Sequence, residues 1–449
     1  MSCTIDKPSP RRWLKRSPSW IIVPWAIFCS FSTYFCMYAF RKPFSAAKYE
    51  GMTFFGTEVD LKTVFIISQI IGYAISKYLG IKICSEMPRS RRMIALIGFI
   101  LIAQLSLLAF AVLPPSLKFL ALFVNGLPLG MVWGLVVWYL EGRRTSELLL
   151  AGLSASFILA SGVVKDVGRW LMGDAVGVSE FWMPFTTGLV FLPAFLFAVF
   201  MLNMLPAPDP ADEAERSRRE PMDGRKRVGF LRRFAPGLTL LFIAYFFLTA
   251  FRDFRDNFGI EVFTALGYGE QPGIFISSET WVAFGVLVPL GLLFLIRNNS
   301  AALLATFGLM MAGSFLMGAA TLAFQAKIIS GLAWMILIGL GAYLAYVPYG
   351  SVLFDRLIAC TRATGTAVFT IYVADALGYT GSVTIYFFKD LIISDVSRLS
   401  FMIGLSYFMS VLGLLLLSSC AVYFYRVSKR SAVVIDEVAQ ELDTVNAVG

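Results

Sequence analysis

The chain has 449 residues, of which 58% are hydrophobic and only 15% charged, and its formal net charge is +9. A soluble globular chain is close to half apolar and a quarter charged, so this composition excludes an ordinary soluble protein and indicates one that lipid surrounds. Nucleic-acid binding is excluded as well, because the basic residues cluster in short loops between apolar runs, the placement that membrane orientation requires.

About twelve apolar runs reach the roughly 20 residues that a membrane-spanning helix needs. We expect spans at residues 20–46, 60–83, 93–113, 117–140, 147–172, 181–204, 236–257, 278–296, 301–323, 326–351, 363–388 and 399–425. The first run is too long for the core of a signal peptide and no clear cleavage site follows it, so we expect it to be retained. The seventh is compatible with an extension toward residue 266 as a longer, tilted element.

The charges of the loops predict the orientation, since cytoplasmic loops carry an excess of Lys and Arg. With the N-terminus inside, the inside loops carry Arg89, Arg91, Arg92, Arg143, Arg144, Arg297, Arg356, Arg362, Arg426, Lys429 and Arg430. The clearest basic residues of the outside loops are Lys118, Lys327, Lys389 and Arg398. We therefore predict a multi-pass protein of the inner or plasma membrane with both termini in the cytoplasm.

One long polar stretch, Pro206 to Phe234, divides the spans six and six and combines proline with mixed charge, as flexible linkers do. Two six-helix halves joined in this way are typical of transporters built from parallel repeats. The predicted fold is an all-α integral membrane protein of twelve transmembrane helices in two pseudo-symmetric six-helix bundles. Its predicted parts are a basic cytoplasmic N-terminus (1–19), an N-terminal bundle (20–205), a cytoplasmic linker (206–234), a C-terminal bundle (235–426) and a cytoplasmic tail (427–449).

Several charged residues lie inside these spans, where a charge costs from about 2.5 to well over 10 kcal/mol and usually faces a water-filled cavity. Arg41 and Lys42 lie late in the first span, in YAFRKPF, and Lys77 lies in the second, in GYAISKYLG. Pro43 could end the first helix here, so Arg41 and Lys42 either reach the outer interface along the lipid or line a cavity. Lys77 either reaches toward the inner loop in the same way or lines the cavity.

The fifth span carries Lys165, Asp166 and Arg169, which form either a local ion pair that eases insertion or a gating or coupling site. The seventh ends in FRDFRDNF, which is either a helix end with ion pairs three and four residues apart or part of the site, with Arg252 the deepest of its charges. Asp375 in the eleventh span is a candidate coupling residue or a partner for a basic residue of another helix. Most of these charges are positive, so we expect a cavity that selects an anion, and Arg is the better phosphate ligand because its planar fork donates two parallel hydrogen bonds.

Small residues mark other spans. In NGLPLGMVWG the glycines Gly126, Gly130 and Gly134 are four apart, which predicts close helix packing. In the tenth span Pro348 and Gly350 should loosen the helix.

Five segments, taken in order, resemble the organophosphate:phosphate antiporter branch of the major facilitator superfamily, which includes the glycerol-3-phosphate and hexose-phosphate transporters. They are YAFRKPFSAA, GYAISKYLG followed by the basic PRSRR loop, NGLPLGMVWG, YVPYGSVLF, and RATGTAVFTIYVADALGYTG. The resemblance implies that Arg41 and a second arginine in the seventh span, Arg252 or Arg255, flank a phosphate at the pseudo-twofold axis, and that Lys77 lines the same cavity. It also implies exchange of an organic phosphate against inorganic phosphate.

The chain departs from this branch at defined points. The usual histidine of the fifth helix is absent, the Asp-Arg pair expected after the second helix is missing from ICSEMPRSRR, and the charges of the fifth and seventh spans are additional. These departures bear on substrate and exchange chemistry more than on fold.

We therefore predict a secondary active transporter that moves a small anionic solute by alternating access, with a phosphorylated solute implied by the resemblance. A non-transporting membrane receptor or sensor of the same fold is the alternative. Without a histidine, a metal cluster or a nucleophile motif we expect no enzyme, cofactor or metal site, and without GxxxxGK[ST] no ATP-driven transport by this chain alone. The expected partners are the solute and the bilayer, and the expected functional unit is a monomer.

Overall fold

The computed structural model describes residues 10–448 except 58, 141, 142, 144, 209–223 and 362–366. The regular elements of this part of the chain are helices, apart from one isolated bridge between Thr53 and Asp60. Eleven of its helices are long and apolar enough to cross a membrane. Lipid offers no hydrogen bonds to the backbone, so a spanning segment satisfies its own polar groups as a helix. The predicted all-α, multi-pass fold is confirmed.

The chain forms two compact units. The first comprises Met1–Ser217, Asp256–Ala283 and Val383–Arg398, and the second comprises Arg218–Arg255, Phe284–Ser382 and Leu399–Gly449. The division runs through four helices, α10 (Ala235–Asn257), α12 (Ile274–Leu293), α16 (Ala367–Phe387) and α17 (Arg398–Val448). The bundles predicted at 20–205 and 235–426 stay a prediction.

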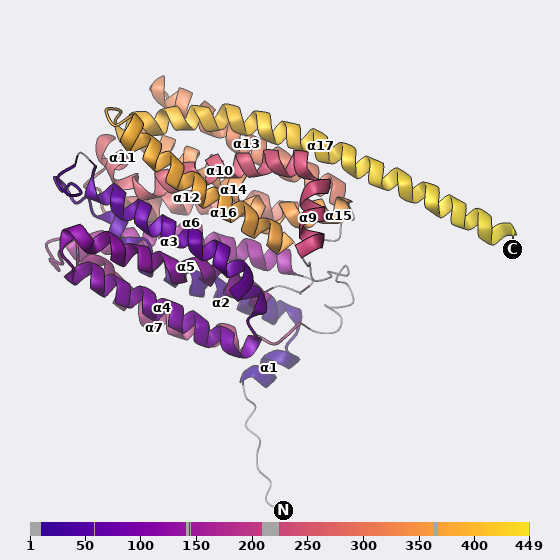
Figure 1. Cartoon of the computed structure of the whole chain (residues 1–449), viewed down its shortest axis with the longest axis horizontal. Helices are drawn as coiled ribbons and strands as arrows, with labels where there is room; N and C mark the ends of the chain where they lie inside the picture. Colours follow the sequence, from indigo (N-terminus) through magenta and orange to yellow (C-terminus); the bar gives the residue numbers. More distant parts are fainter. Residues whose placement is uncertain are drawn as a thin grey trace, which may run out of the picture. The chain divides into compact units, whose positions relative to one another are not determined.

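In the first unit spanning helices that are far apart in the sequence pack together, as well as sequence neighbours (Figure 1). Helix α3 packs against α5, α4 against α5 and α7, and α2 against α6 and α7. The helices of this unit are α1 (Pro10–Arg16), α2 (Ser19–Met37), α3 (Leu61–Glu86), α4 (Arg89–Val112), α5 (Lys118–Leu140), α6 (Ser146–Met172), α7 (Met183–Asn203) and α11 (Gly259–Ala265).

Glycines make the contact between α3 and α5 close. A Cβ added at Gly126 would overlap the carbonyl oxygen of Gln69, and one added at Gly130 would lie 2.7 Å from that of Tyr73. No side chain fits between the two backbones at these points, which confirms that the glycine ridge of α5 is a packing surface and identifies α3 as its partner.

The second unit contains α9 (Gly224–Arg233), α13 (Asn299–Gln325), α14 (Gly331–Ser351) and α15 (Leu353–Thr361) in addition to its parts of α10, α12, α16 and α17. Helix α13 packs against α14 and α15. Helix α14 continues through Pro348 and ends at Ser351, so the proline lies within its last turn and does not end it.

Two expectations, for the end of the first span and for the extension of the seventh, are wrong. The first span does not run as one helix to residue 46: α2 ends at Met37 and two 3-10 turns follow, Tyr38–Phe40 and Pro43–Ala46, because Pro43 has no N–H to continue the ladder. The seventh does not extend as one element, since α10 ends at Asn257 and α11 is a separate helix. The linker predicted over 206–234 contains α9 after residues 209–223, which lie outside the described part of the chain.

Candidate functional site

Arg41 follows the first 3-10 turn of the broken first span, and its side chain lies inside the protein with 1% of its surface exposed. The carbon at the centre of its guanidinium group lies 3.8 Å from the ring centroid of Tyr73 on α3 and 5.9 Å from that of Tyr38. This burial excludes the alternative in which Arg41 reaches along the lipid to the interface.

Lys77 lies one helical turn beyond Tyr73 on α3, and it is 2% exposed. Its Nζ atom is 5.4 Å from the centroid of the same Tyr73 ring. Two of the predicted site residues, from the first and second spans, thus approach one aromatic side chain that sequence reasoning had not singled out.

The backbone at the break of the first span is held by two buried amide side chains. Gln69 donates from Nε2 to the carbonyl of Arg41 at 2.8 Å and to Oδ1 of Asn125 at 2.7 Å. Asn125 donates from Nδ2 to the carbonyl of Phe40 at 3.0 Å and to that of Ala103 at 3.1 Å. Asn125 begins the NGLPLGMVWG stretch, in which the sequence pattern assigned a role only to the glycines.

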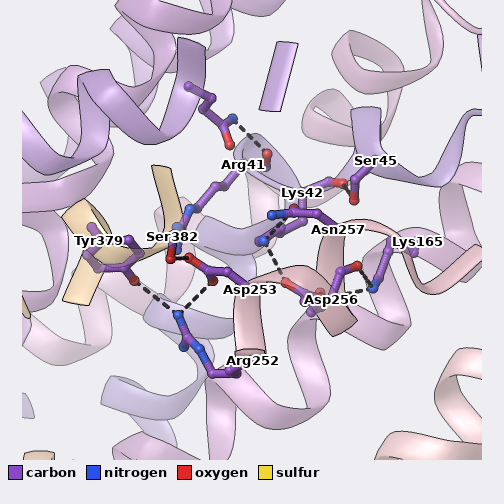
Figure 2. Close-up of polar contacts among 12 residues, drawn as sticks. Arg41, Lys42, Ser45, Lys165, Arg252, Asp253, Asp256, Asn257, Tyr379 and Ser382 are labelled. Carbon is purple, nitrogen blue, oxygen red and sulfur yellow. Dashed lines mark hydrogen bonds and ion pairs between the residues drawn. The ribbon is translucent and has the colours of Figure 1, made fainter. Parts of the chain in front are cut away.

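Asp256 is the centre of a second cluster in the first unit (Figure 2). Its Oδ2 lies 2.5 Å from Nζ of Lys42 and its Oδ1 lies 2.8 Å from Nζ of Lys165, which also donates to the Asp256 carbonyl at 2.9 Å. Ser161 donates a further hydrogen bond to Oδ1. One carboxylate therefore joins the end of the first span, the fifth span and the end of α10. Asp256 thus pairs with lysines of other spans. The interpretation of FRDFRDNF as a helix end had placed its ion pairs within that segment.

The neighbouring Asn257 extends this Asp256 cluster. Its Oδ1 accepts from Nζ of Lys42 at 2.8 Å, and its Nδ2 donates to the hydroxyl of Tyr386 at 2.8 Å. A separate ion pair involves Glu261, four residues after Asn257: its Oε1 lies 2.5 Å from Nζ of Lys62. Three cations of the first unit are therefore tied to the segment that begins at the end of α10.

The other two predicted gating residues of the fifth span also contact this segment. Asp166 accepts the backbone N–H of Ile276 at 2.7 Å and lies 3.9 Å from Arg169, which donates to the carbonyls of Gly269 and Gln271. Asp166 and Arg169 line a cavity of about 950 Å³ whose wall also includes Trp170, Glu180 and Glu270. All three charged residues of the fifth span, Lys165, Asp166 and Arg169, thus contact residues 256–276. The local ion pair between Asp166 and Arg169 is longer than any of the hydrogen bonds to that segment.

A buried tyrosine beside this cavity stays neutral. The backbone N–H groups of Lys48 and Tyr49 donate to Oε1 of Glu180 at 3.2 and 3.4 Å. Burial raises the pKa of the Tyr49 hydroxyl well above its ordinary value, and the negative charge of Glu180 raises it further.

In the second unit Arg252 lies among aromatic side chains (Figure 2). Its Nη2 is 2.8 Å from Oδ1 of Asp253 and 3.4 Å from the hydroxyl of Tyr379, and its guanidinium carbon is 4.4 Å from the ring centroid of Tyr346. Asp253 accepts a second bond from Ser382 at 2.8 Å. Arg252 thus resembles Arg41 in having an aromatic ring beneath its guanidinium group.

Arg255 has different surroundings. It donates from Nη2 to the carbonyl of Met335 in α14 at 3.0 Å. Its guanidinium group packs against Gly339, and a Cβ added to this glycine would lie only 2.5 Å from the guanidinium carbon. These contacts connect α10 to the backbone of α14.

Asp375 lies in α16, where Oδ1 accepts a hydrogen bond from the hydroxyl of Tyr245 at 2.6 Å. The ring of Tyr245 stacks on that of Tyr346 with centroids 5.0 Å apart, and Tyr346 is the ring beneath Arg252. Two tyrosines of the second unit, Tyr245 and Tyr346, therefore connect Asp375 to Arg252.

Comparison with solved structures gives the class of the fold. The chain is similar to a D-xylose-proton symporter, with 15% identity, a TM-score of 0.56, and coverage of 89% of this chain and 97% of that one. It is similar to a POT peptide transporter, solved as a point mutant in complex with alafosfalin, with 14% identity, a TM-score of 0.56, and coverage of 90% and 95%. At this identity the similarity concerns the fold alone, so the chain has the multi-pass helical fold of these two transporters.

The particular family follows from the sequence. Residues 43–427 match the family of unknown function DUF5690, and the chain belongs to that family. No curated protein sequence matches the chain.

Proposed function

We propose that this protein is a secondary active transporter that moves a small anionic solute across the inner or plasma membrane by alternating access. The observation that carries the proposal is the approach of Arg41 and Lys77 to the Tyr73 ring inside the first unit. Both cations are almost fully buried, Lys77 within a candidate span and Arg41 directly after another, and charges buried in such segments usually mark a solute or ion path. An anion at this site would be attracted by both cations.

A phosphorylated solute suits the chemistry of this site best. A guanidinium group presents its N–H donors in a planar fork that matches two oxygens of a phosphate, and a Lys adds a point charge. The guanidinium carbon of Arg41 lies over the Tyr73 ring, and phosphate oxygens are bound by the N–H groups of the guanidinium fork. Arg252 over Tyr346 repeats the arrangement in the second unit.

The carboxylate of Asp256 supports the alternating-access part of the proposal. It binds lysines of the first and fifth spans to the end of α10. A closed gate needs contacts that can be exchanged for water when the path opens, and charged groups can make that exchange at lower cost than a packed apolar surface. We assign gating to Lys165, Asp166 and Arg169, and a role in coupling to Asp375.

Counterflow in proteoliposomes tests the proposal. Vesicles loaded with inorganic phosphate should take up labelled glycerol 3-phosphate or a sugar phosphate, and Arg41→Ala should abolish the uptake. Uptake by Arg41→Ala at the wild-type rate would contradict the proposed site. Saturable binding without counterflow would instead indicate the receptor or sensor of the same fold. A thermal-shift screen of phosphorylated sugars, glycerol phosphate and dicarboxylates identifies the solute class, because a ligand that binds only the folded state stabilises it.

The two arginines of α10 provide a matched pair for the same assay. Arg252→Ala should remove uptake, whereas Arg255→Ala, which removes the bond to the Met335 carbonyl, should lower the unfolding midpoint and leave the half-saturating solute concentration unchanged. The reverse result would assign the solute to Arg255.

The proposed orientation has its own test. Cysteines introduced near residues 10 and 430 should react with an impermeant thiol reagent only in inverted vesicles, because both termini are proposed to lie in the cytoplasm. Labelling of either in right-side-out cells would contradict the orientation.

A further inference from the structure

The break of the first span leaves two carbonyl groups without their usual helical donors. In a continuous helix the N–H of Ser45 would donate to the carbonyl of Arg41, but here it donates to the carbonyl of Lys42 at 3.0 Å. Pro43 interrupts the ladder in the same stretch, since it has no N–H. A buried carbonyl that has lost its partner costs about 1–3 kcal/mol, so a fold that keeps this break needs donors from elsewhere.

Side-chain amides supply those donors. Gln69 donates to the Arg41 carbonyl and Asn125 to the Phe40 carbonyl, and the two amides are joined to each other at 2.7 Å. Gln69 is 3% exposed and Asn125 is fully buried. The close contact at Gly126 brings the backbones of α3 and α5 together beside these amides. We call Gln69 and Asn125 the amide clamp.

The clamp and the candidate anion site share one face of α3. Gln69, Tyr73 and Lys77 are spaced four residues apart, so their side chains lie one above another along the helix. Gln69 holds the backbone of Arg41, while Tyr73 lies beneath its guanidinium group and also near Lys77. A single helix face therefore fixes Arg41 at two points and places a second cation one turn further along.

We propose that the amide clamp is a positioning device for anion recognition: Gln69 and Asn125 set the backbone at Phe40–Arg41 so that the Arg41 guanidinium presents its donors to a phosphate-bearing solute. This inference rests on the proposed function, because it assigns to Arg41 the role of solute ligand. Gln69 and Asn125 themselves act through Arg41, and their loss weakens recognition by misplacing it.

The experiment uses the full-length purified protein and inorganic phosphate as the probe, with the half-saturating phosphate concentration read from thermal stabilisation. Gln69→Leu removes the donor to Arg41. Ser68→Ala is the matched control, because the neighbouring Ser68 also bridges α3 and α5, by a 2.6 Å bond to the Phe119 carbonyl, without contacting the break. Both variants should lower the unfolding midpoint without phosphate, and only Gln69→Leu should raise the half-saturating concentration, by at least about fivefold, equivalent to about 1 kcal/mol.

A double-variant comparison separates positioning from general damage. In an Arg41→Ala background, Gln69→Leu should add no further change in half-saturation, because the group that it positions is gone. An additive effect there, or equal effects of Gln69→Leu and Ser68→Ala on half-saturation, overturns the inference. If Gln69→Leu does not fold, Gln69→Met keeps the unbranched length of the side chain, removes the donor, and is judged by the same criterion.

The failure of the proposed function gives a different pattern. If Arg41→Ala itself leaves half-saturation at the wild-type value, the proposed anion site falls and the inference falls with it. If Arg41→Ala weakens phosphate binding while Gln69→Leu behaves like Ser68→Ala, the clamp alone is rejected.

Discussion

Arg41 and Lys42 are adjacent in the sequence and both almost fully buried, yet their described contacts differ. Arg41 lies over the ring of Tyr73, and Lys42 pairs with the carboxylate of Asp256. A cation over an aromatic face gains about 0.5–2 kcal/mol. Removing one member of a buried ion pair costs about 3–5 kcal/mol. Under the proposed function, these neighbouring cations divide two tasks: Arg41 recognises the solute and Lys42 holds helices together.

The largest effect should come from the carboxylate side of this comparison. Asp256→Ala leaves Lys42 and Lys165 without the group that they share, so we expect a loss of about 3–5 kcal/mol in stability, seen as a lower thermal unfolding midpoint. Lys42→Met/Lys165→Met/Asp256→Leu should recover most of this loss, because it removes the charges together with their partner. If Asp256→Ala unfolds at the wild-type midpoint, the ion pairs of Asp256 contribute nothing to stability.

The next effect concerns the frame that carries Tyr73. Gly126→Ala drives a methyl group into the Gln69 carbonyl, and overpacking of this kind costs about 1–3 kcal/mol in stability. Gly98→Ala on α4 is the control, since nothing lies within 4 Å of its added Cβ, and Ala should stabilise that helix by up to about 1 kcal/mol. Unfolding midpoints that move in the same direction would contradict the close α3–α5 contact.

Charge-preserving exchanges sharpen the comparison itself. Arg41→Lys keeps the charge and loses the planar fork, so phosphate half-saturation should rise about tenfold, equivalent to about 1.4 kcal/mol. Lys42→Arg keeps the pair with Asp256 and should leave half-saturation unchanged, whatever it costs in stability. Phosphate titrations of the two purified variants check this, and equal shifts would remove the proposed division of tasks.

The smallest effect should come from an exposed pair. Lys48 and Glu50 lie 3.3 Å apart, but the Glu50 side chain is 78% exposed. Surface pairs are worth about 0–1 kcal/mol, so Glu50→Ala should change the free energy of unfolding by less than about 0.5 kcal/mol. Thermal unfolding at low and high salt measures this change. A loss of stability as large as that of Asp256→Ala would contradict the expectation that buried ion pairs contribute more than exposed ones.

Local patterns in the sequence were sufficient for the spans. The apolar run from 117 to 140 predicted α5, found at Lys118–Leu140, and the glycines within it predicted a close packing surface. The break of the first span at Met37 was missed, although Pro43 was visible, because a proline allows a helix to end without stating how many residues earlier it does so.

The candidate site was predictable in part. Arg41 and Lys77 stood out because charge is rare in a span, whereas Tyr73 and Gln69 did not, since uncharged residues carry no comparable signal. Their positions four and eight residues before Lys77 were the signal available, and this spacing becomes meaningful only once Arg41 is known to lie against that face of α3.

Hydropathy, length and the positions of the charges are properties of short segments, so the sequence by itself determined a multi-pass helical protein and the cations that need explanation. The partner of Lys42 and of Lys165 was decided by tertiary structure alone. Lys42, Lys165 and Asp256 come from three separate spans, and only the packing of those helices brings the two ammonium groups to 2.5 and 2.8 Å from the carboxylate. The Coulomb energy depends on that distance, which no local pattern encodes.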